Sequence, residues 1–206
     1  TKELFGHLRK GDEWIVRDQG AMVRQLGYTP KEFAEKLIKD EGGSKNAKKL
    51  FNQNSDTKSN YKPIPLKVNS AGEKYSKILK KNFSNSYGFG DYDRSANICW
   101  PGNKIGHGRD DVIYFWNSIK NILSNLEFSI EHVGYLEEAN KNPKASIRWF
   151  LRGCHSNKSN EYGDATNSDL FIMGINHVEF GEYGIIKEWV LFDEVALWKQ
   201  ILIKGN

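Results

Sequence analysis

The stretch GIIKEWVLFD, residues 184–193, closes the last of four long strand-like segments in this chain. Its second part, EWVLFD at 188–193, reappears as EWIVRD at 13–18. The match continues without a gap through an alanine, a glutamine and a leucine or isoleucine, and each matched pair lies 175 residues apart (188 minus 13). A fixed offset of this kind indicates an internal repeat. The sequence therefore predicts the tail of one module followed by a complete second module.

The first part of this organisation is residues 1–43, which we expect to be the C-terminal strand and helices of a preceding, missing module. Within it, Glu13–Asp18 is predicted to be a strand, Gln19–Leu26 a helical turn and Lys31–Lys39 a helix that stops at two glycines. An unpaired strand is costly to leave exposed. We therefore expect Glu13–Asp18 to pair with an edge of the second module or with another chain.

A linker and a complete domain follow. Residues 44–71 are rich in Lys, Asn and Ser and carry two prolines, which is typical of a linker. Residues 72–206 form the complete domain, with helices predicted over Glu73–Phe83 and Arg109–Leu126. The second of these helices should place Trp116, with Ile119 and Leu123, against the sheet beside Trp149 or Trp189.

The strand-like segments are Glu127–Glu137, Ala145–Gly153, Ser168–Phe180 and Ile185–Asp193. The connections between them are too short for crossover helices, so neighbouring strands are expected to be antiparallel. Helices followed by a meander indicate an α+β fold. We predict a cone-shaped, curved, antiparallel-rich sheet packed against about three helices.

Composition limits the partners. The chain has 206 residues, of which 27% are charged and 38% hydrophobic, and its net charge is +4. Lysines gather between Lys31 and Lys81, a stretch without arginine that lacks the interleaving of arginine and aromatic residues expected of a nucleic-acid groove, so nucleic-acid binding is not expected. No apolar run reaches the length of a membrane span. The two cysteines and five histidines have no metal-ligand spacing, and neither a metal nor another cofactor is expected. These features predict a cytoplasmic protein.

The C-terminal domain resembles the SnoaL-like polyketide cyclases of the nuclear transport factor 2-like (NTF2-like) superfamily. The residues that carry this resemblance, in order, are IRWFLRGCH at 147–155, Gly163, Gly174 with His177, GIIKEW at 184–189, Asp193 and Gln200. The likeness spans about residue 72 to the C-terminus. The earlier copy at 13–26 resembles the closing motif of such a module.

The resemblance implies an apolar pocket between sheet and helices, an apolar small molecule as ligand, and pairing through the sheet into a homodimer. In cyclases of this branch, an acidic residue at the position matching Asp193 serves as acid and base in an intramolecular aldol closure. The loop at 156–161 and the turn at 164–167 depart from the family pattern. Both lie beside the expected pocket, so the substrate does not carry over.

Asp193 is the first candidate catalytic residue. Strand alternation places it on one face with Trp189, and apolar walls would make its carboxylate a better proton acceptor. The alternative is that Asp193 caps the helix that follows, because Asp is a favoured N-cap. His177 and His155 could each donate a hydrogen bond to a developing enolate oxygen. Packing against apolar neighbours, for His177, and stabilisation of a turn, for His155, are the alternatives.

Arg148 could orient a substrate oxygen, although an arginine on a strand more often faces water. The aromatic residues predicted to line the ligand pocket are Trp149, Trp189, Trp116, Trp100 and Phe171. Aromatic residues make up 13% of the chain, which fits either a lined cavity or an aromatic-rich core.

Two function classes remain. The first is an acid/base enzyme that performs aldol cyclisation, isomerisation or dehydration on an apolar carbonyl compound. The second is a noncatalytic ligand-binding or dimerisation module, because a fold does not fix a function. A buried Asp193 carboxylate facing a cavity would favour the enzyme. A filled core, with Asp193 bonded only to backbone amides, would favour the module.

Overall fold

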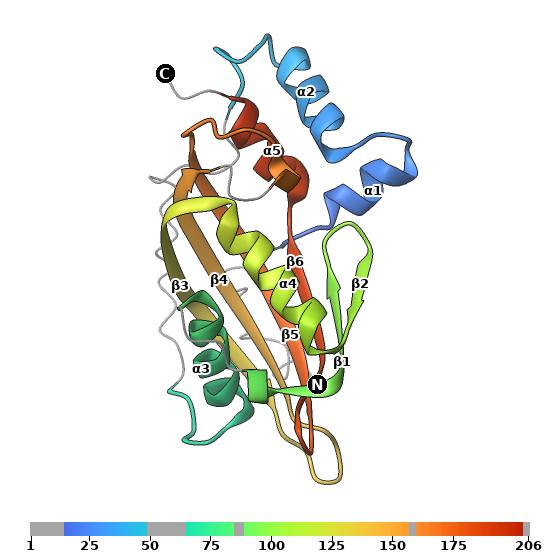
Figure 1. Ribbon diagram of the computed structural model, residues 1–206, viewed down its shortest axis with the longest axis vertical. Coiled ribbons are helices and arrows are strands. Elements are labelled where there is room, and N and C mark those ends of the chain that lie inside the picture. The colour runs from blue at the N-terminus through green and yellow to red at the C-terminus, as the bar shows by residue number, and fades with distance from the viewer. Residues whose placement is uncertain (1–14, 49–64, 85–88, 157–159, 204–206) are drawn as a thin grey trace, which may run out of the picture.

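The computed structural model describes residues 15–48, 65–84, 89–156 and 160–203. These ranges contain five α-helices, two short 3-10 helices (η1, Phe89–Asp91, and η2, Asn160–Tyr162) and one sheet of six strands. Figure 1 shows the helices gathered on one side and one end of this sheet. The predicted α+β class, with a curved sheet packed against helices, is confirmed.

The sheet has the strand order β2-β1-β6-β5-β4-β3. The bounds are β1 Tyr92–Trp100, β2 Lys104–His107, β3 Leu123–Leu136, β4 Lys144–His155, β5 Asp169–Gly181 and β6 Gly184–Phe192. The four predicted strands are β3 to β6, and each pairs antiparallel with the next, as expected. The parallel pairing of β1 with β6 was not predicted. It brings the first strand of the domain against the last.

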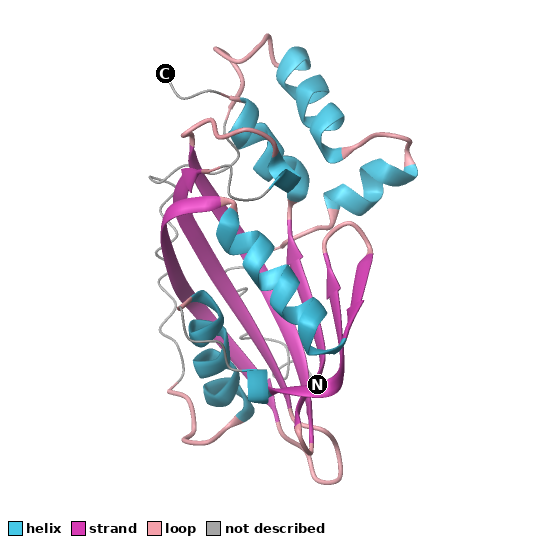
Figure 2. Ribbon diagram, viewed as in Figure 1, coloured by secondary structure: helices cyan, strands magenta, loops and turns pink. Residues whose placement is uncertain are grey.

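Helices α3 (Ala71–Phe83) and α4 (Gly108–Asn121) lie across one face of the sheet, which we call the inner face (Figure 2). Helix α5 (Glu194–Leu202) follows β6 at one end of the sheet, and α1 (Gln19–Gln25) and α2 (Pro30–Asp40) lie beyond α5. The opposite face of the sheet, the outer face, carries no helix among the described residues.

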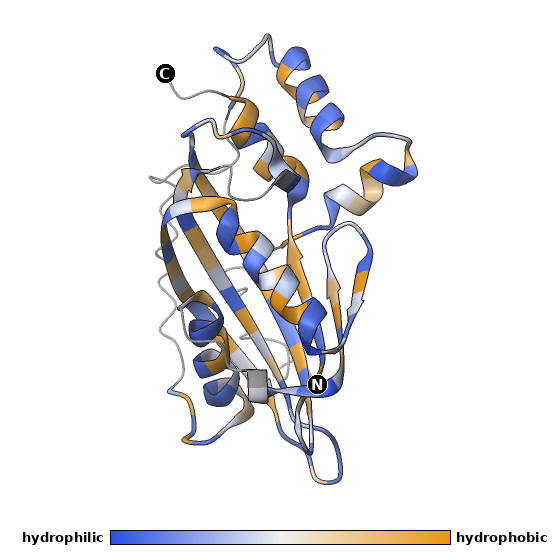
Figure 3. Ribbon diagram, viewed as in Figure 1, coloured by the Kyte–Doolittle hydropathy of each residue, from blue (hydrophilic) through white to orange (hydrophobic). Residues whose placement is uncertain are grey.

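Alternation along the strands decides what each face holds. In β4 the odd-numbered residues Ile147, Trp149 and Leu151 are fully buried in the main core with α3 and α4. Trp116 of α4 meets Trp149 edge to face, with ring centroids 6.4 Å apart. The predicted packing of this helix on Trp149 is therefore present. Figure 3 shows the matching alternation of apolar and polar residues along the strands.

The predicted helix Arg109–Leu126 is too long. Helix α4 ends at Asn121, and Leu123 already pairs with His155 in the sheet. Ile122 and Leu123 are both buried, so the apolar stripe of the helix continues into the first residues of the strand. Burial on both sides of the boundary explains why the pattern did not reveal it.

The predicted strand at 13–18 is not present in its described part, and residues 13 and 14 lie outside the described ranges. Ile15 to Asp18 has no regular secondary structure and no strand neighbour. Its side chains make the contact instead: Val16 packs on a second buried cluster, formed by Phe150, Phe171 and Met173 on the outer face. The expectation that this segment pairs with an edge strand was therefore wrong for its described residues.

The helices after this segment dock on α5. Val23 and Ala34 pack on Val195 in a small apolar cluster. Arg24 Nη1 lies 2.5 Å from the buried carboxylate of Glu194, and Nζ of the buried Lys199 lies 2.5 Å from Glu41. Apolar contacts and two ion pairs therefore fix the N-terminal helices to the C-terminal helix.

Candidate functional site

Asp193 stands at the start of α5 and caps it. Its Oδ1 accepts hydrogen bonds from the backbone amides of Val195 (2.9 Å) and Ala196 (3.0 Å). Burial raises its pKa, these two hydrogen bonds lower it, and the nearby charges of Asp18 and Glu194 raise it further. The carboxylate serves the backbone of α5, which is the capping role that the sequence also allowed.

The equivalent residue of the first copy does the same at α1. Asp18 accepts from the amide of Ala21 at 2.8 Å and also from the amide of Gly102, at 2.9 Å, in the β1–β2 turn. Both copies of the repeated motif therefore end in an aspartate that starts a helix.

The three predicted catalytic residues are not brought together. Phe192, which precedes Asp193, pairs with Gly174, so Asp193 lies near the level of Met173. His177 is four residues along β5 from that level, or about 13 Å at the rise of a strand. His155 lies five residues from Phe150, the partner of Met173, in the other direction, which is roughly 16 Å.

The surroundings of the two histidines also differ. His177 is exposed on the outer face, between Ser146 and Trp189 of the neighbouring strands. His155 is fully buried, and its Nδ1 lies 3.0 Å from Oγ1 of Thr166. Burial lowers the pKa of His155. The contact of His155 with the turn at Thr166 agrees with a role in stabilising that turn.

The residues predicted to bind ligand divide between the two faces. Trp149 and Trp116 are buried on the inner face, where Trp100 stacks on Phe115 with ring centroids 5.2 Å apart. Phe171 lies on the outer face against Phe150, and the guanidinium of Arg148 lies 5.8 Å from the centre of the Phe150 ring. Trp189, also on the outer face, is 43% exposed. They do not line one pocket.

The inner face instead holds a buried carboxylate, Glu188, that the sequence analysis did not select. Its Oε1 accepts from Tyr75 Oη at 2.5 Å and from Asn176 Nδ2 at 3.0 Å, and its Oε2 accepts from Tyr92 Oη at 2.8 Å. Trp149 Nε1 donates to Asn176 Oδ1 at 2.6 Å. Strand parity could have found Glu188, because it shares the apolar face of β6 with Val190 and Phe192.

Burial controls the electrostatics of this group, which we call the Glu188 cluster (Glu188, Tyr75, Tyr92, Asn176 and Trp149). Burial raises the pKa of Glu188, while hydrogen bonds from Tyr75, Tyr92 and Asn176 lower it. Burial and the charge of Glu188 raise the pKa of both tyrosines well above the ordinary value. The cluster satisfies a costly buried charge with three donors.

The described hollows lie away from this cluster. A hollow of about 600 Å³ on the outer face is bordered by Gly134, Ser146, His177 and Trp189. A second, of about 430 Å³, lies between α3 and the turn that joins β5 to β6. A third hollow, of only about 20 Å³, lies between α4 and the sheet and is bordered by Trp100, Phe115 and Phe192. None of the described hollows is therefore a ligand-sized pocket beneath α4, where aromatic side chains pack on one another.

Over the described ranges, no three His, Cys, Asp or Glu side chains gather in a way that could hold a metal ion. Cys99 and Cys154 are free thiols. Within the same ranges, every helix is too short or too polar to cross a membrane.

Solved structures share this architecture. A candidate SnoaL-like polyketide cyclase from Jannaschia sp. CCS1 aligns with a TM-score of 0.51 at 12% identity, covering 66% of this chain and 97% of its own. A candidate polyketide cyclase from Pseudomonas putida KT2440 aligns with a TM-score of 0.53 at 7% identity, covering 64% of this chain and 98% of its own. No protein-family model and no curated protein matches the sequence. At these identities the likeness establishes the fold.

Proposed function

We propose that this chain, which has the NTF2-like fold of the SnoaL-like polyketide cyclases, is a noncatalytic module that pairs with a second copy of itself through the outer face of its sheet. The observation that carries this proposal is a row of outer-face residues across five strands. In register order the row is Gly134, Ser146, His177, Trp189 and Cys99.

This row combines an exposed aromatic ring with a hollow. Trp189 exposes 43% of its surface and borders the hollow together with the small residues Gly134 and Ser146. A two-fold axis over the row would place each Trp189 ring in the hollow of its partner, which is the geometry of an isologous interface. Tryptophan is also enriched among residues that dominate interface energy.

The hydrogen bonds of the two candidate carboxylates indicate structural roles. Glu188 accepts three hydrogen bonds from buried donors, and Asp193 accepts two from the backbone of α5. A general base must reach the proton that it removes. Neither carboxylate borders one of the described hollows.

One observation favours the second candidate, acid/base catalysis on an apolar carbonyl compound. Glu188 combines a raised pKa with two tyrosine hydroxyls, a combination found at acid/base sites. Substrate access would then require the inner core to open. Native mass spectrometry separates the two functions: a co-purified small molecule that is lost in Glu188→Gln favours the enzyme, and an unliganded mass favours the module.

The repeat belongs to the same proposal. Residues 1–43 would be the closing segment of an equivalent module, 44–71 the linker and 72–206 the complete domain. The helix that Asp18 caps and the one that Asp193 caps support this equivalence. Their contacts through Arg24 and Glu194 would hold successive modules together.

Sedimentation equilibrium tests the pairing. The wild type is expected to dimerise, and Trp189→Lys to weaken the dimer by at least about 10-fold, as expected for the loss of a central interface tryptophan. Tyr114→Lys is the matched control, because Tyr114 is 59% exposed on α4, away from the outer face. A wild-type monomer at every concentration, or an unchanged dimer in Trp189→Lys, would refute the proposal.

A further inference from the structure

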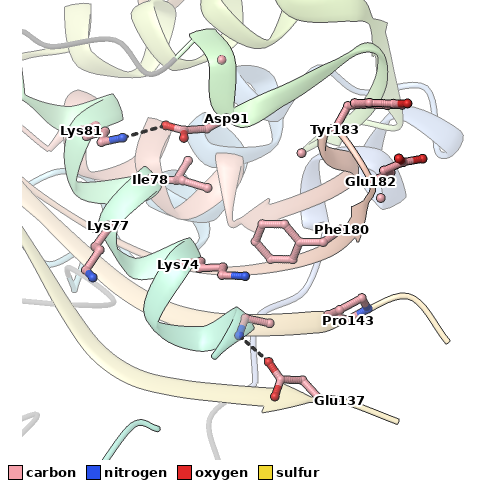
Figure 4. Close-up of a pocket in the computed structure, with 14 residues that line it drawn as sticks. Lys74, Lys77, Ile78, Lys81, Asp91, Glu137, Pro143, Phe180, Glu182 and Tyr183 are labelled. Atoms are coloured by element: carbon pink, nitrogen blue, oxygen red, sulfur yellow. Dashed lines mark hydrogen bonds and ion pairs between the residues drawn. The ribbon is translucent and has the colours of Figure 1, made fainter. Parts of the chain in front are cut away.

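The hollow of about 430 Å³ between α3 and the β5–β6 turn, which we call the α3 pocket, lies where α3 meets the strand ends at the edge of the inner face. It shares no bordering residue with the hollow on the outer face. Its floor is apolar, formed by Ala71 and Ile78 of α3 with Pro143 and Phe180 from the ends of the strands. Figure 4 shows Ile78, Pro143 and Phe180 around the opening. Its volume lies in the range of pockets that hold small molecules.

Three lysines of α3 border this pocket: Lys74, Lys77 and Lys81. Their spacing of three and four residues places them along one side of the helix. They end the lysine-rich part of the chain, between Lys31 and Lys81. Their position beside an apolar floor makes them candidates for binding an anionic ligand.

The charged side chains around the pocket differ in whether they have a partner. Lys81 lies 3.0 Å from Asp91, and Lys77 lies 2.9 Å from Glu73. Glu137 accepts from the backbone amide of Ala71 at 2.8 Å, and Glu182, the third carboxylate that borders the pocket, belongs to the β5–β6 turn. Lys74 has no ion pair within the described ranges, and its side chain extends from α3 toward Phe180 (Figure 4). An ammonium group without an ion pair therefore borders the same pocket as an aromatic ring.

We propose that the α3 pocket binds a small amphipathic anion, with its carboxylate or phosphate on Lys74 and its apolar body on Phe180 and Ile78. Charge-assisted hydrogen bonds to a carboxylate or phosphate are stronger than neutral ones. The apolar floor gains from covering a short alkyl or aryl group. This site differs from the interior pocket for an apolar molecule that the sequence predicted, and it does not depend on dimerisation.

The test is an NMR titration of backbone amides with octanoate, octyl phosphate and the neutral octanol. We expect saturable shifts at Lys74, Ile78 and Phe180 with one or both anions, and binding of octanol weaker by about 3- to 10-fold, the range of a partly exposed charge contact. The stronger of the two anions identifies the headgroup.

Three variants make the assignment specific. Lys74→Met is expected to remove the preference for the anion and leave octanol binding unchanged, and Lys74→Arg to retain that preference. Lys80→Met is the matched control, because Lys80 is exposed on α3 but does not border the pocket. Three results would overturn the proposal: no saturable shift with either anion, equal binding of octanol and anions, or an unchanged preference in Lys74→Met.

Discussion

Glu188 and Trp189 are neighbours on β6 and serve opposite faces of the sheet. Glu188 is 1% exposed and holds two tyrosines and an asparagine inside the domain, whereas Trp189 is 43% exposed on the outer face. The distribution is the reverse of what polarity alone suggests. An ionisable group is buried among three hydrogen-bond donors, and a large apolar ring is left at the surface.

This contrast separates structural residues from residues available for binding. The polar groups of the inner face form hydrogen bonds with one another, so removing any of them leaves a buried partner without its hydrogen bond. The outer face exposes a large aromatic ring. Burial of that ring against a partner would be favourable, so this face is the one expected to associate. We therefore expect substitutions on the inner face to change stability and substitutions on the outer face to change assembly.

The largest difference in stability should appear when a tryptophan is replaced with alanine on each face of the sheet in turn. Trp149→Ala is expected to lower the free energy of unfolding by about 3–5 kcal/mol, because it opens a cavity and leaves Asn176 without a donor. Trp189→Ala should cost under about 1 kcal/mol at a protein concentration where the chain is monomeric. Urea unfolding of both variants measures the difference, and equal losses would remove the distinction between the faces.

A second, intermediate effect concerns the carboxylate itself. Glu188→Gln keeps the shape of the side chain but replaces one acceptor with a donor that faces a tyrosine hydroxyl. We expect a loss of about 1–3 kcal/mol near neutral pH. A variant as stable as the wild type would show that the Glu188 cluster does not depend on its charge.

The pH dependence of the free energy of unfolding gives a second test of the role of Glu188. The folded-state pKa of Glu188 is raised above its ordinary value of 4.5, so the unfolded state releases this proton first as pH rises. The stabilising contribution of Glu188 is complete below about 4.5 and is lost as pH rises through the raised folded-state pKa. The stability of the wild type relative to Glu188→Gln should therefore fall over that window. A constant difference would contradict the raised pKa.

The smallest effect is expected at Asp193, which the sequence offered either as a candidate base or as a helix cap. Asp193→Ala removes the cap of α5 and should cost about 1 kcal/mol, while Asp193→Asn keeps a capping oxygen and should cost only a few tenths. Thermal unfolding of both variants measures this. A loss of several kcal/mol in Asp193→Asn would show that the negative charge has a role beyond capping.

The sequence predicted the strands β3 to β6 and their antiparallel order because alternation and short connections are local signals. It did not predict the parallel pairing of β1 with β6, which joins segments almost a hundred residues apart. The end of α4 was missed because buried residues continue from the helix into β3. Tertiary contact decides both features.

Asp193 was found from the family resemblance, and its capping alternative from residue type alone. Glu188 was missed although it belongs to the repeated motif, because its partners Tyr75, Tyr92 and Asn176 lie on three other elements. Strand parity assigns Trp149 and Trp189 to opposite faces of the sheet only when it is known which residues of each strand face the helices. Distant partners are therefore the part of a site that this sequence did not reveal.

The most direct test of the account is the distance between two copies, measured by pulsed electron paramagnetic resonance on spin-labelled cysteines. Replacing Cys99 and Cys154 with serine removes the native thiols. Lys187→Cys then places a label on the outer face beside the hollow, and Tyr114→Cys places one on α4. Pairing through the outer face predicts dipolar coupling with a shorter distance between the labels at 187 than between those at 114. A shorter distance at 114, or no coupling at 187, would contradict pairing through the outer face.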